Sequence, residues 1–199
     1  MNPETPRFRV LCPTRWTVRA DCLKSVLDNY SVIQMGCKLR NDTETHARIV
    51  GVKSQMASFV FLIGVSLCYE ILRHTDILSK TLQQRTMSAS EGQDLAKLTV
   101  TTLQKLCSDD AYEDFWEKLD STLETVDVSE PALPRRRKAP KRFDTGSAPN
   151  EYPQTPKGMY RHTFYEAFDL VINCIQDRFD QPGFYVYKNL QDILLCGRT

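Results

Sequence analysis

Glycine and histidine are scarce in this chain of 199 residues, which holds only 8 glycines and 3 histidines. So few glycines argue against a β fold rich in tight turns and favour helices. The histidines, His46, His74 and His162, have no cysteine or histidine at the spacings that metal sites use. A glycine-rich phosphate loop and a G-x-S-x-G turn are also absent from the sequence. We therefore expect no metal site, no cofactor, no catalytic residue and no enzymatic activity.

Signals for secretion and membrane insertion are also missing. The N-terminal stretch MNPETPRFRV is polar and does not resemble a signal peptide. The uncharged run from Ser54 to Tyr69 is shorter than the ~20 residues that cross a bilayer, so it predicts a buried central helix and no membrane partner. The odd number and scattered spacing of the cysteines favour reduced thiols in an intracellular protein over a disulfide framework. The seven are Cys12, Cys22, Cys37, Cys68, Cys107, Cys174 and Cys196.

Apolar residues recur three or four positions apart along most of the chain, which predicts an all-α fold of roughly six to eight helices. One stripe predicts a single helix from Val18 to Cys37, and a second helix opens near Thr43 with an end that the pattern leaves open. Ser88 and Glu91 have the spacing of a capping box, and Asp109 is predicted to cap the next helix. The predicted buried stripes are Leu95, Leu98, Thr102 and Leu106; Tyr112, Phe115, Trp116, Leu119 and Leu123; and Tyr160, Phe164, Phe168, Val171 and Ile175.

Proline content divides the chain into four parts. Residues 1–16 are predicted to be an extended N-terminal segment, and residues 17–126 a helical bundle. Six of the ten prolines lie in residues 127–159, which we predict to be a basic, Pro-rich loop that projects from the bundle. Residues 160–199 are predicted to form two C-terminal helices, separated at Pro182–Gly183, that pack on the same bundle. The expected architecture is an irregular helical bundle with one long loop.

Positive charge is concentrated in one segment. The net charge of the chain is +1, whereas RRRKAPKR carries +6, which leaves −5 for the rest. Its cations are Arg135, Arg136, Arg137, Lys138, Lys141 and Arg142. Three interpretations stay open: a solvated loop, a nuclear localisation signal read by an import receptor through residues 135–142, and a loop that grips phosphates. We expect the nucleus as the location, or the cytoplasm if the segment is no import signal.

A tryptophan among arginines is the second candidate site. Trp16 lies between Arg15 and Thr17, and Arg19 follows shortly after. Trp16 can be a core residue at the entry to a helix, since tryptophan is usually buried. Alternatively, it can stack on an unpaired base while a neighbouring guanidinium holds a phosphate.

Four blocks in this order resemble the hAT superfamily of DNA transposases: CPTRW, ILRHTDILSKTLQQ, ALPRRRKAPKRF and YRHTFYEAFDLVINCIQDRFDQ. More narrowly, the chain looks like transposase-derived proteins related to the MYM-type zinc-finger group, from about Arg9 to Leu195. The resemblance implies the all-helical insertion domain of an RNase H-like transposase. It also implies that Arg15 and Trp16 belong to a DNA-handling site, where the tryptophan stacks on a flipped base.

The resemblance places the catalytic Asp-Asp-Glu residues outside this chain, so two-metal chemistry is not expected. The first functional hypothesis is a transposase-derived nuclear protein that binds nucleic acid, with DNA as partner. The residues expected to bind are Arg15, Trp16, Arg19, Arg135, Arg136, Arg137, Lys138, Lys141 and Arg142. The alternative is a catalytically silent helical module, or a remnant without function, that meets a protein partner or the remainder of a transposase-like domain.

Overall fold

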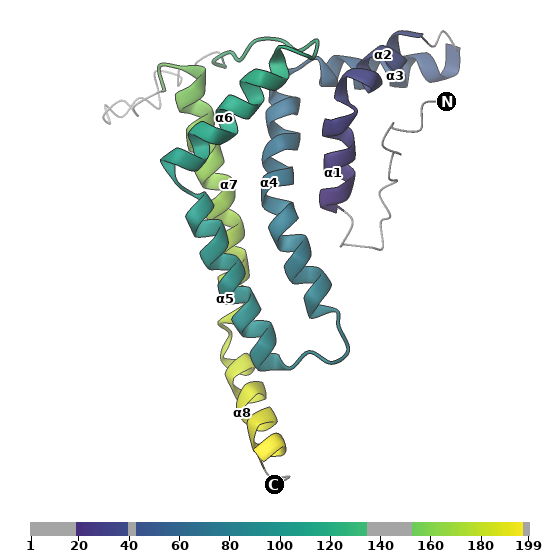
Figure 1. Cartoon of the computed structure of the whole chain (residues 1–199). Coiled ribbons are helices and arrows are strands. Elements are labelled where there is room, and N and C mark those ends of the chain that lie inside the picture. Colours follow the sequence, from purple (N-terminus) through teal and green to yellow (C-terminus); the bar gives the residue numbers. More distant parts are fainter. Residues whose placement is uncertain (1–18, 40–42, 135–152, 197–199) are drawn as a thin grey trace, which may run out of the picture.

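The computed structural model describes residues 19–39, 43–134 and 153–196 (Figure 1). Within these ranges the fold is all-α, with eight helices and no strand. The helices are α1 (Arg19–Asp28), α2 (Tyr30–Leu39), α3 (Thr43–Met56), α4 (Phe59–Leu82), α5 (Ala89–Leu106), α6 (Asp109–Leu123), α7 (Pro156–Phe179) and α8 (Pro182–Cys196). The sequence-based prediction of an all-α fold is confirmed.

Helix α4 occupies the middle of the molecule because it is the most apolar of the long helices. It packs against α1 on one side and α5 on the other, and α5 packs in turn against α7 (Figure 1). Helices α2 and α3 lie across the end of the molecule where α4 begins, and α8 extends from the opposite end. The buried face of α4 runs through Phe59, Leu62, Ile63, Leu67, Ile71 and Leu78, as expected for a central helix.

Aromatic side chains form the centre of the core. Phe59 of α4 lies 5.2 Å from Tyr160 of α7 between ring centroids, and Tyr112 of α6 lies 5.3 Å from Phe164 in an edge-to-face arrangement. Such ring pairs contribute about 0.5–1.5 kcal/mol each beyond the area that they bury. The aromatic stripes predicted for residues 112–123 and 160–175 are therefore confirmed, with Ile172 more deeply buried than Val171.

The helix predicted from Val18 to Cys37 is interrupted at Asn29. The buried Asn29 side chain donates its Nδ2–H to the Ser25 carbonyl, at 2.8 Å. In a continuous helix, that carbonyl would accept the backbone N–H of residue 29. The Asn29 side chain thus competes for a helical acceptor at the residue where α1 ends and α2 begins.

The helix that opens at Thr43 also ends earlier than the apolar run suggested. The Met56 carbonyl, the last of α3, accepts hydrogen bonds from the Tyr30 hydroxyl at 2.8 Å and from Gln34 Nε2 at 3.1 Å. Burial raises the pKa of Tyr30 to about 12, so its hydroxyl remains a donor. Because both donors come from α2, tertiary contacts end α3, and α4 starts after an extended Ser58.

No single helix in the described ranges is long and apolar enough to cross a bilayer. Residues Arg48–Met56 and Phe59–Leu82 together meet the length and hydropathy criteria, but they are bent by 77° at the break between them.

The buried face of α5 differs from the prediction, although the capping box of Ser88 and Glu91 is confirmed. Leu98 is 62% exposed, while the buried residues include Ala96, Val100 and Leu103. The buried positions follow the predicted ones by one residue, as Ala96, Thr99 and Leu103 do, while Leu95 and Leu106 are partly buried against the core. A Cβ atom at Gly92 would lie 3.2 Å from the Leu82 side chain, so the glycine allows α5 to approach the end of α4 closely.

The cap of α6 was also predicted wrongly. Ser108, one residue before Asp109, is the N-cap, and its side chain accepts the Ala111 N–H at 3.3 Å. Asp109 lies in the first turn, where a carboxylate complements the helix dipole.

Part of the predicted loop 127–159 is attached to the bundle. Gln34 donates to the Asp127 carbonyl at 2.8 Å and accepts the Asp127 N–H at 3.1 Å. The Ser129 N–H donates to the Ala57 carbonyl at 2.8 Å. Beyond the loop, α7 begins at Pro156 with Thr155 as its N-cap, four residues before the expected start of the C-terminal helices.

Candidate functional site

The described residues include one member of the predicted nucleic-acid site. Arg19 is the first residue of α1. The other predicted members lie outside the described residues, namely Arg15, Trp16, Arg135, Arg136, Arg137, Lys138, Lys141 and Arg142. What the structure defines is therefore the surroundings of Arg19 and the helices that flank residues 135–142.

The start of α1 is held by a buried carboxylate of α4. Asp76 is 5% exposed, and its Oδ2 accepts the Ala20 N–H at 2.9 Å. The first amides of a helix lack partners within the helix, and its dipole favours a negative charge there. Asp76 thus fixes the position of Arg19 against α4. The sequence offered a weak signal for this role, because Asp76 interrupts an otherwise apolar helical pattern.

A second polar group lies one turn earlier on the same helix. Arg73 forms an ion pair with Glu70 at 2.9 Å, and its Nε–H donates to His74 Nε2 at 3.1 Å. Burial, followed by the charge of Arg73, lowers the pKa of His74. A neutral imidazole is the form that can accept the hydrogen bond from Arg73, so the geometry and the pKa agree.

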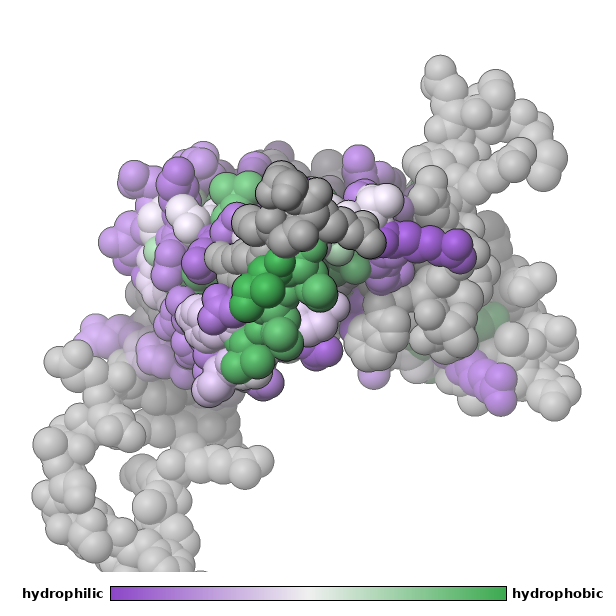
Figure 2. Space-filling view, turned by 90° about the horizontal axis from the view of Figure 1, so that it is seen from below, coloured by the Kyte–Doolittle hydropathy of each residue, from purple (hydrophilic) through white to green (hydrophobic). Residues whose placement is uncertain are grey.

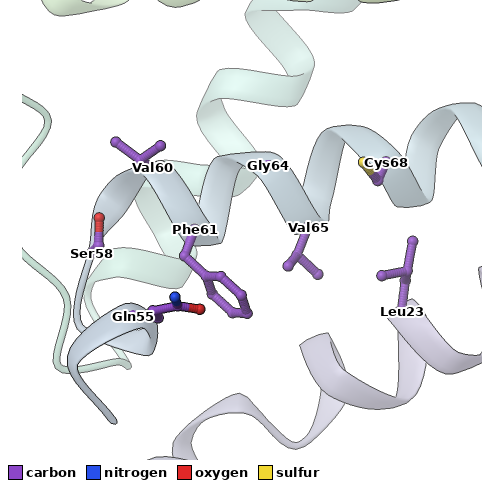
Figure 3. A pocket seen from close by; sticks show the side chains of 8 residues that line it. All are labelled: Leu23, Gln55, Ser58, Val60, Phe61, Gly64, Val65 and Cys68. Atoms are coloured by element: carbon purple, nitrogen blue, oxygen red, sulfur yellow. The ribbon is translucent and has the colours of Figure 1, made fainter. Parts of the chain in front are cut away.

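The groove between α1 and α4 contains an apolar hollow of about 450 Å³ (Figure 3). Leu23 of α1 lies opposite Phe61, Val65 and Cys68 of α4, and Gly64 leaves part of the α4 surface bare. Its lining suits an aliphatic or aromatic group rather than a charged one.

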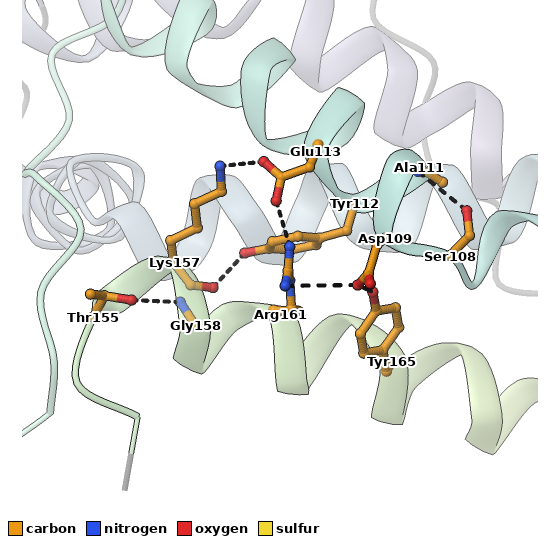
Figure 4. Close-up of polar contacts among 10 residues, drawn as sticks. All are labelled: Ser108, Asp109, Ala111, Tyr112, Glu113, Thr155, Lys157, Gly158, Arg161 and Tyr165. Atoms are coloured by element: carbon orange, nitrogen blue, oxygen red, sulfur yellow. Dashed lines mark hydrogen bonds and ion pairs between the residues drawn. The ribbon is translucent and has the colours of Figure 1, made fainter.

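A cluster of ion pairs joins the beginning of α7 to α6 (Figure 4). The Glu113 carboxylate of α6 forms ion pairs with Lys157 and Arg161 of α7, and the distance from Arg161 Nη2 to Glu113 Oε1 is 2.5 Å. The guanidinium carbon of Arg161 also lies 5.2 Å from the Tyr112 ring centroid, within reach of a cation–π contact. Hydrogen bonding from Lys157 is the main cause that lowers the pKa of Glu113.

Two tyrosines extend this ion-pair cluster. The Tyr112 hydroxyl donates to the Lys157 carbonyl at 2.6 Å, and the Tyr165 hydroxyl donates to Asp109 Oδ1 at 2.5 Å. Burial raises the pKa of Tyr165 to about 12, with the Asp109 contact as a further cause, so the hydroxyl keeps its proton. The cluster therefore joins α6 directly to α7, which are separated in the sequence by the segment that includes residues 135–142.

The described part of α8 carries an exposed apolar surface at the far end of the molecule. Figure 2 looks onto this end and shows apolar side chains gathered at the tip. We call this surface the α8 stripe; its members are Val186, Tyr187, Leu190, Ile193 and Leu194, each 54–71% exposed. The sequence predicted this helix correctly. The prediction that it packs on the bundle is wrong for these five side chains, because they are exposed.

Metal ligands do not gather in the described part of the chain: no group of three or more His, Cys, Asp or Glu residues there could hold an ion. Four cysteine side chains are described, and they form no disulfide with one another: Cys22, Cys68, Cys107 and Cys174. No protein-family model matches the chain, and no solved structure matches it.

Proposed function

We propose that this chain is a helical nucleic-acid-binding domain of hAT transposase descent that acts in the nucleus. The observation that carries the proposal is the charge contrast: residues 135–142 hold six cations, while the rest of the chain carries −5. Each arginine or lysine that contacts a phosphate releases a condensed counterion, so such a segment binds nucleic acid without needing a rigid site. Arg15 and Trp16 are proposed to add stacking on an unpaired base.

The ion-pair cluster makes this proposal testable without disturbing the fold. Glu113, Lys157 and Arg161 join α6 to α7 directly, so the cations of residues 135–142 can be neutralised while these contacts stay intact. We expect far-UV circular dichroism and thermal unfolding of such a variant to match the wild type.

The test is a titration of the purified chain with a fluorescent hairpin DNA over a range of salt concentrations. If all six cations contact phosphates, the logarithm of affinity should fall against the logarithm of salt with a slope between about −4, for contacts to the single-stranded loop, and about −5, for contacts to the duplex stem. Replacing the six with glutamine should remove most of that slope. Trp16→Ala should weaken hairpin binding by about 1–3 kcal/mol and duplex binding by less.

A matched control comes from six exposed cations elsewhere in the described chain: Lys53, Arg85, Lys97, Lys105, Lys118 and Arg178. Replacing these with glutamine changes the net charge by the same amount, so any larger loss from residues 135–142 reports their position rather than total charge. Equal losses from the two variants would contradict the proposal. A fluorescent fusion that leaves the nucleus when residues 135–142 are neutralised, while DNA binding is unchanged, would support an import signal instead.

The α8 stripe favours a second candidate function, a helical module that binds protein. The largest contiguous apolar patch on a protein surface is often a site of association. The stripe meets that description, since five large side chains in one short helix are more than half exposed.

A further inference from the structure

The α8 stripe has the spacing of a helix that packs against another helix. Val186, Leu190 and Ile193 are separated by four and then three residues, and Tyr187 and Leu194 flank them. At about 100° per residue, the five positions fall within an arc of ~120°, which is the width of a core-facing stripe. None of the five is charged, so no residue of the stripe opposes burial.

The stripe is also symmetric about Leu190. Val186 and Leu194 lie four positions before and after it, and Tyr187 and Ile193 lie three positions before and after it. In an antiparallel pair of identical helices centred on Leu190, Val186 of each copy meets Leu194 of the other, and Tyr187 meets Ile193. Such mutual exchange of contacts is the property of an interface with twofold symmetry.

We propose that the α8 stripe pairs with the α8 stripe of a second copy of this chain, with the two helices antiparallel and centred on Leu190. In an antiparallel pair the two helix dipoles point in opposite directions, which is favourable. Because α8 extends away from the bundle (Figure 1), an antiparallel pair also places the two bundles at opposite ends. This inference rests on the second candidate function, a module that binds protein, and names its partner. It does not depend on nucleic-acid binding.

The tip of the second α8 would point back toward the first bundle. Near the base of α8, a hollow of about 570 Å³ lies between α4 and α7, lined in part by Leu78, Leu82 and Phe179.

The area of the stripe sets the strength of the pairing. Large side chains at these exposed fractions contribute roughly 100 Å² each, or about 500 Å² for the stripe. A standard interface buries about 800 Å² per partner, so the pair lies at the low end and should dissociate on dilution. We expect a reversible dimer rather than an obligate one.

Sedimentation velocity of the full chain between ~1 and ~100 μM tests the proposal. The wild type should shift from monomer to dimer across this range. Leu190→Glu places two carboxylates at the centre of the pair and should raise the dissociation constant at least ~100-fold. The matched control is Leu98→Glu, since Leu98 is similarly exposed, at 62%, but lies on α5; it should change the constant less than ~3-fold.

A second measurement tests direction and register. Val186→Lys and Leu194→Glu should each weaken self-association, whereas an equimolar mixture should form a heterodimer, because antiparallel pairing brings these two positions together. Parallel pairing would set position 186 against position 186 and give no rescue. Circular dichroism of each variant establishes that α8 remains helical.

A wild type that stays monomeric at ~100 μM would overturn the proposal, as would equal effects of Leu190→Glu and Leu98→Glu. Absence of rescue in the mixture would overturn the antiparallel register. The hairpin-DNA titration is independent of these outcomes, so failure of the dimer leaves the nucleic-acid proposal standing.

Discussion

Helices α7 and α8 are neighbours in sequence and both carry an apolar stripe, but only that of α7 is covered. Tyr160, Phe164, Phe168, Ile172 and Ile175 recur every three or four residues on α7, and all are at most 9% exposed. The five members of the α8 stripe have similar spacing, and each is at least 54% exposed. The periodicity of a sequence thus establishes that a helix has an apolar face, but not what covers that face.

The ends of the two helices explain part of the difference. At the end of α7, Gln93 of α5 is 3% exposed and donates its Nε2–H to the Phe179 carbonyl at 3.3 Å. This contact satisfies one of the last carbonyls of α7, which lack partners within the helix. Pro182 then starts α8, at the point where the predicted break lies.

The largest expected difference is in the free energy of unfolding, when one large side chain in each stripe is replaced by alanine. Phe168→Ala in α7 removes a side chain that is 1% exposed and should lower the free energy of unfolding by about 3–5 kcal/mol. Leu190→Ala in α8 should lower it by less than ~0.5 kcal/mol when the protein is dilute enough to be monomeric. Urea titrations of both variants measure this difference. Similar losses from the two substitutions would show that α8 is covered within one chain.

Acid should loosen α7 before it affects α8. The pKa of Glu113 lies below its ordinary value of 4.5 in the folded chain, mainly because of Lys157. The ion pairs of Glu113 therefore stabilise the fold fully above the ordinary pKa of the carboxyl group, and this contribution is lost as the pH falls through the lowered pKa.

Urea titrations of the wild type and Glu113→Gln at pH 7 and at a series of lower pH values check this expectation. The two proteins should differ in stability at neutral pH and converge in acid. The α8 stripe contains no carboxylate, so its self-association should respond less. A constant gap between the two proteins would assign the effect of Glu113→Gln to packing.

A glycine near the start of α8 offers the smallest expected effect. A Cβ atom at Gly183 would meet nothing within 4 Å. Gly183→Ala should therefore favour the helical state of α8, but it should change global stability by no more than ~0.5 kcal/mol. Slower amide hydrogen exchange in α8, with unchanged exchange in α7, would confirm that α8 opens independently of the bundle.

Local signals in the sequence predicted the fold class, the capping box at Ser88 and Glu91 and the aromatic stripes, because each depends on residues a few positions apart. The break at Asn29 was missed and the end of the helix at Met56 was left open, because buried side-chain hydrogen bonds lie at both places and those at Met56 come from another helix. The face of α5 was misplaced by about one residue, because the exposed Leu98 fits the same helical spacing as the buried Ala96, Thr99 and Leu103.

The candidate site was predictable to a smaller extent. The charge of residues 135–142 is evident in the sequence, whereas Asp76 at the start of α1 and Glu113 in the ion-pair cluster depend on helices that are distant in the chain. Contacts of this kind have no signature in spacing, since the partners are 44–56 residues apart.

The reciprocal hydrogen bonds between Gln34 and Asp127 join residues 93 positions apart. Closing so long a segment has an entropic cost that must be met before the contact contributes, so we expect this pair to form late in folding. Interactions that form after the transition state slow unfolding and leave the folding rate nearly unchanged. The Gln34–Asp127 pair therefore acts on the lifetime of the folded chain more than on the speed at which the chain folds.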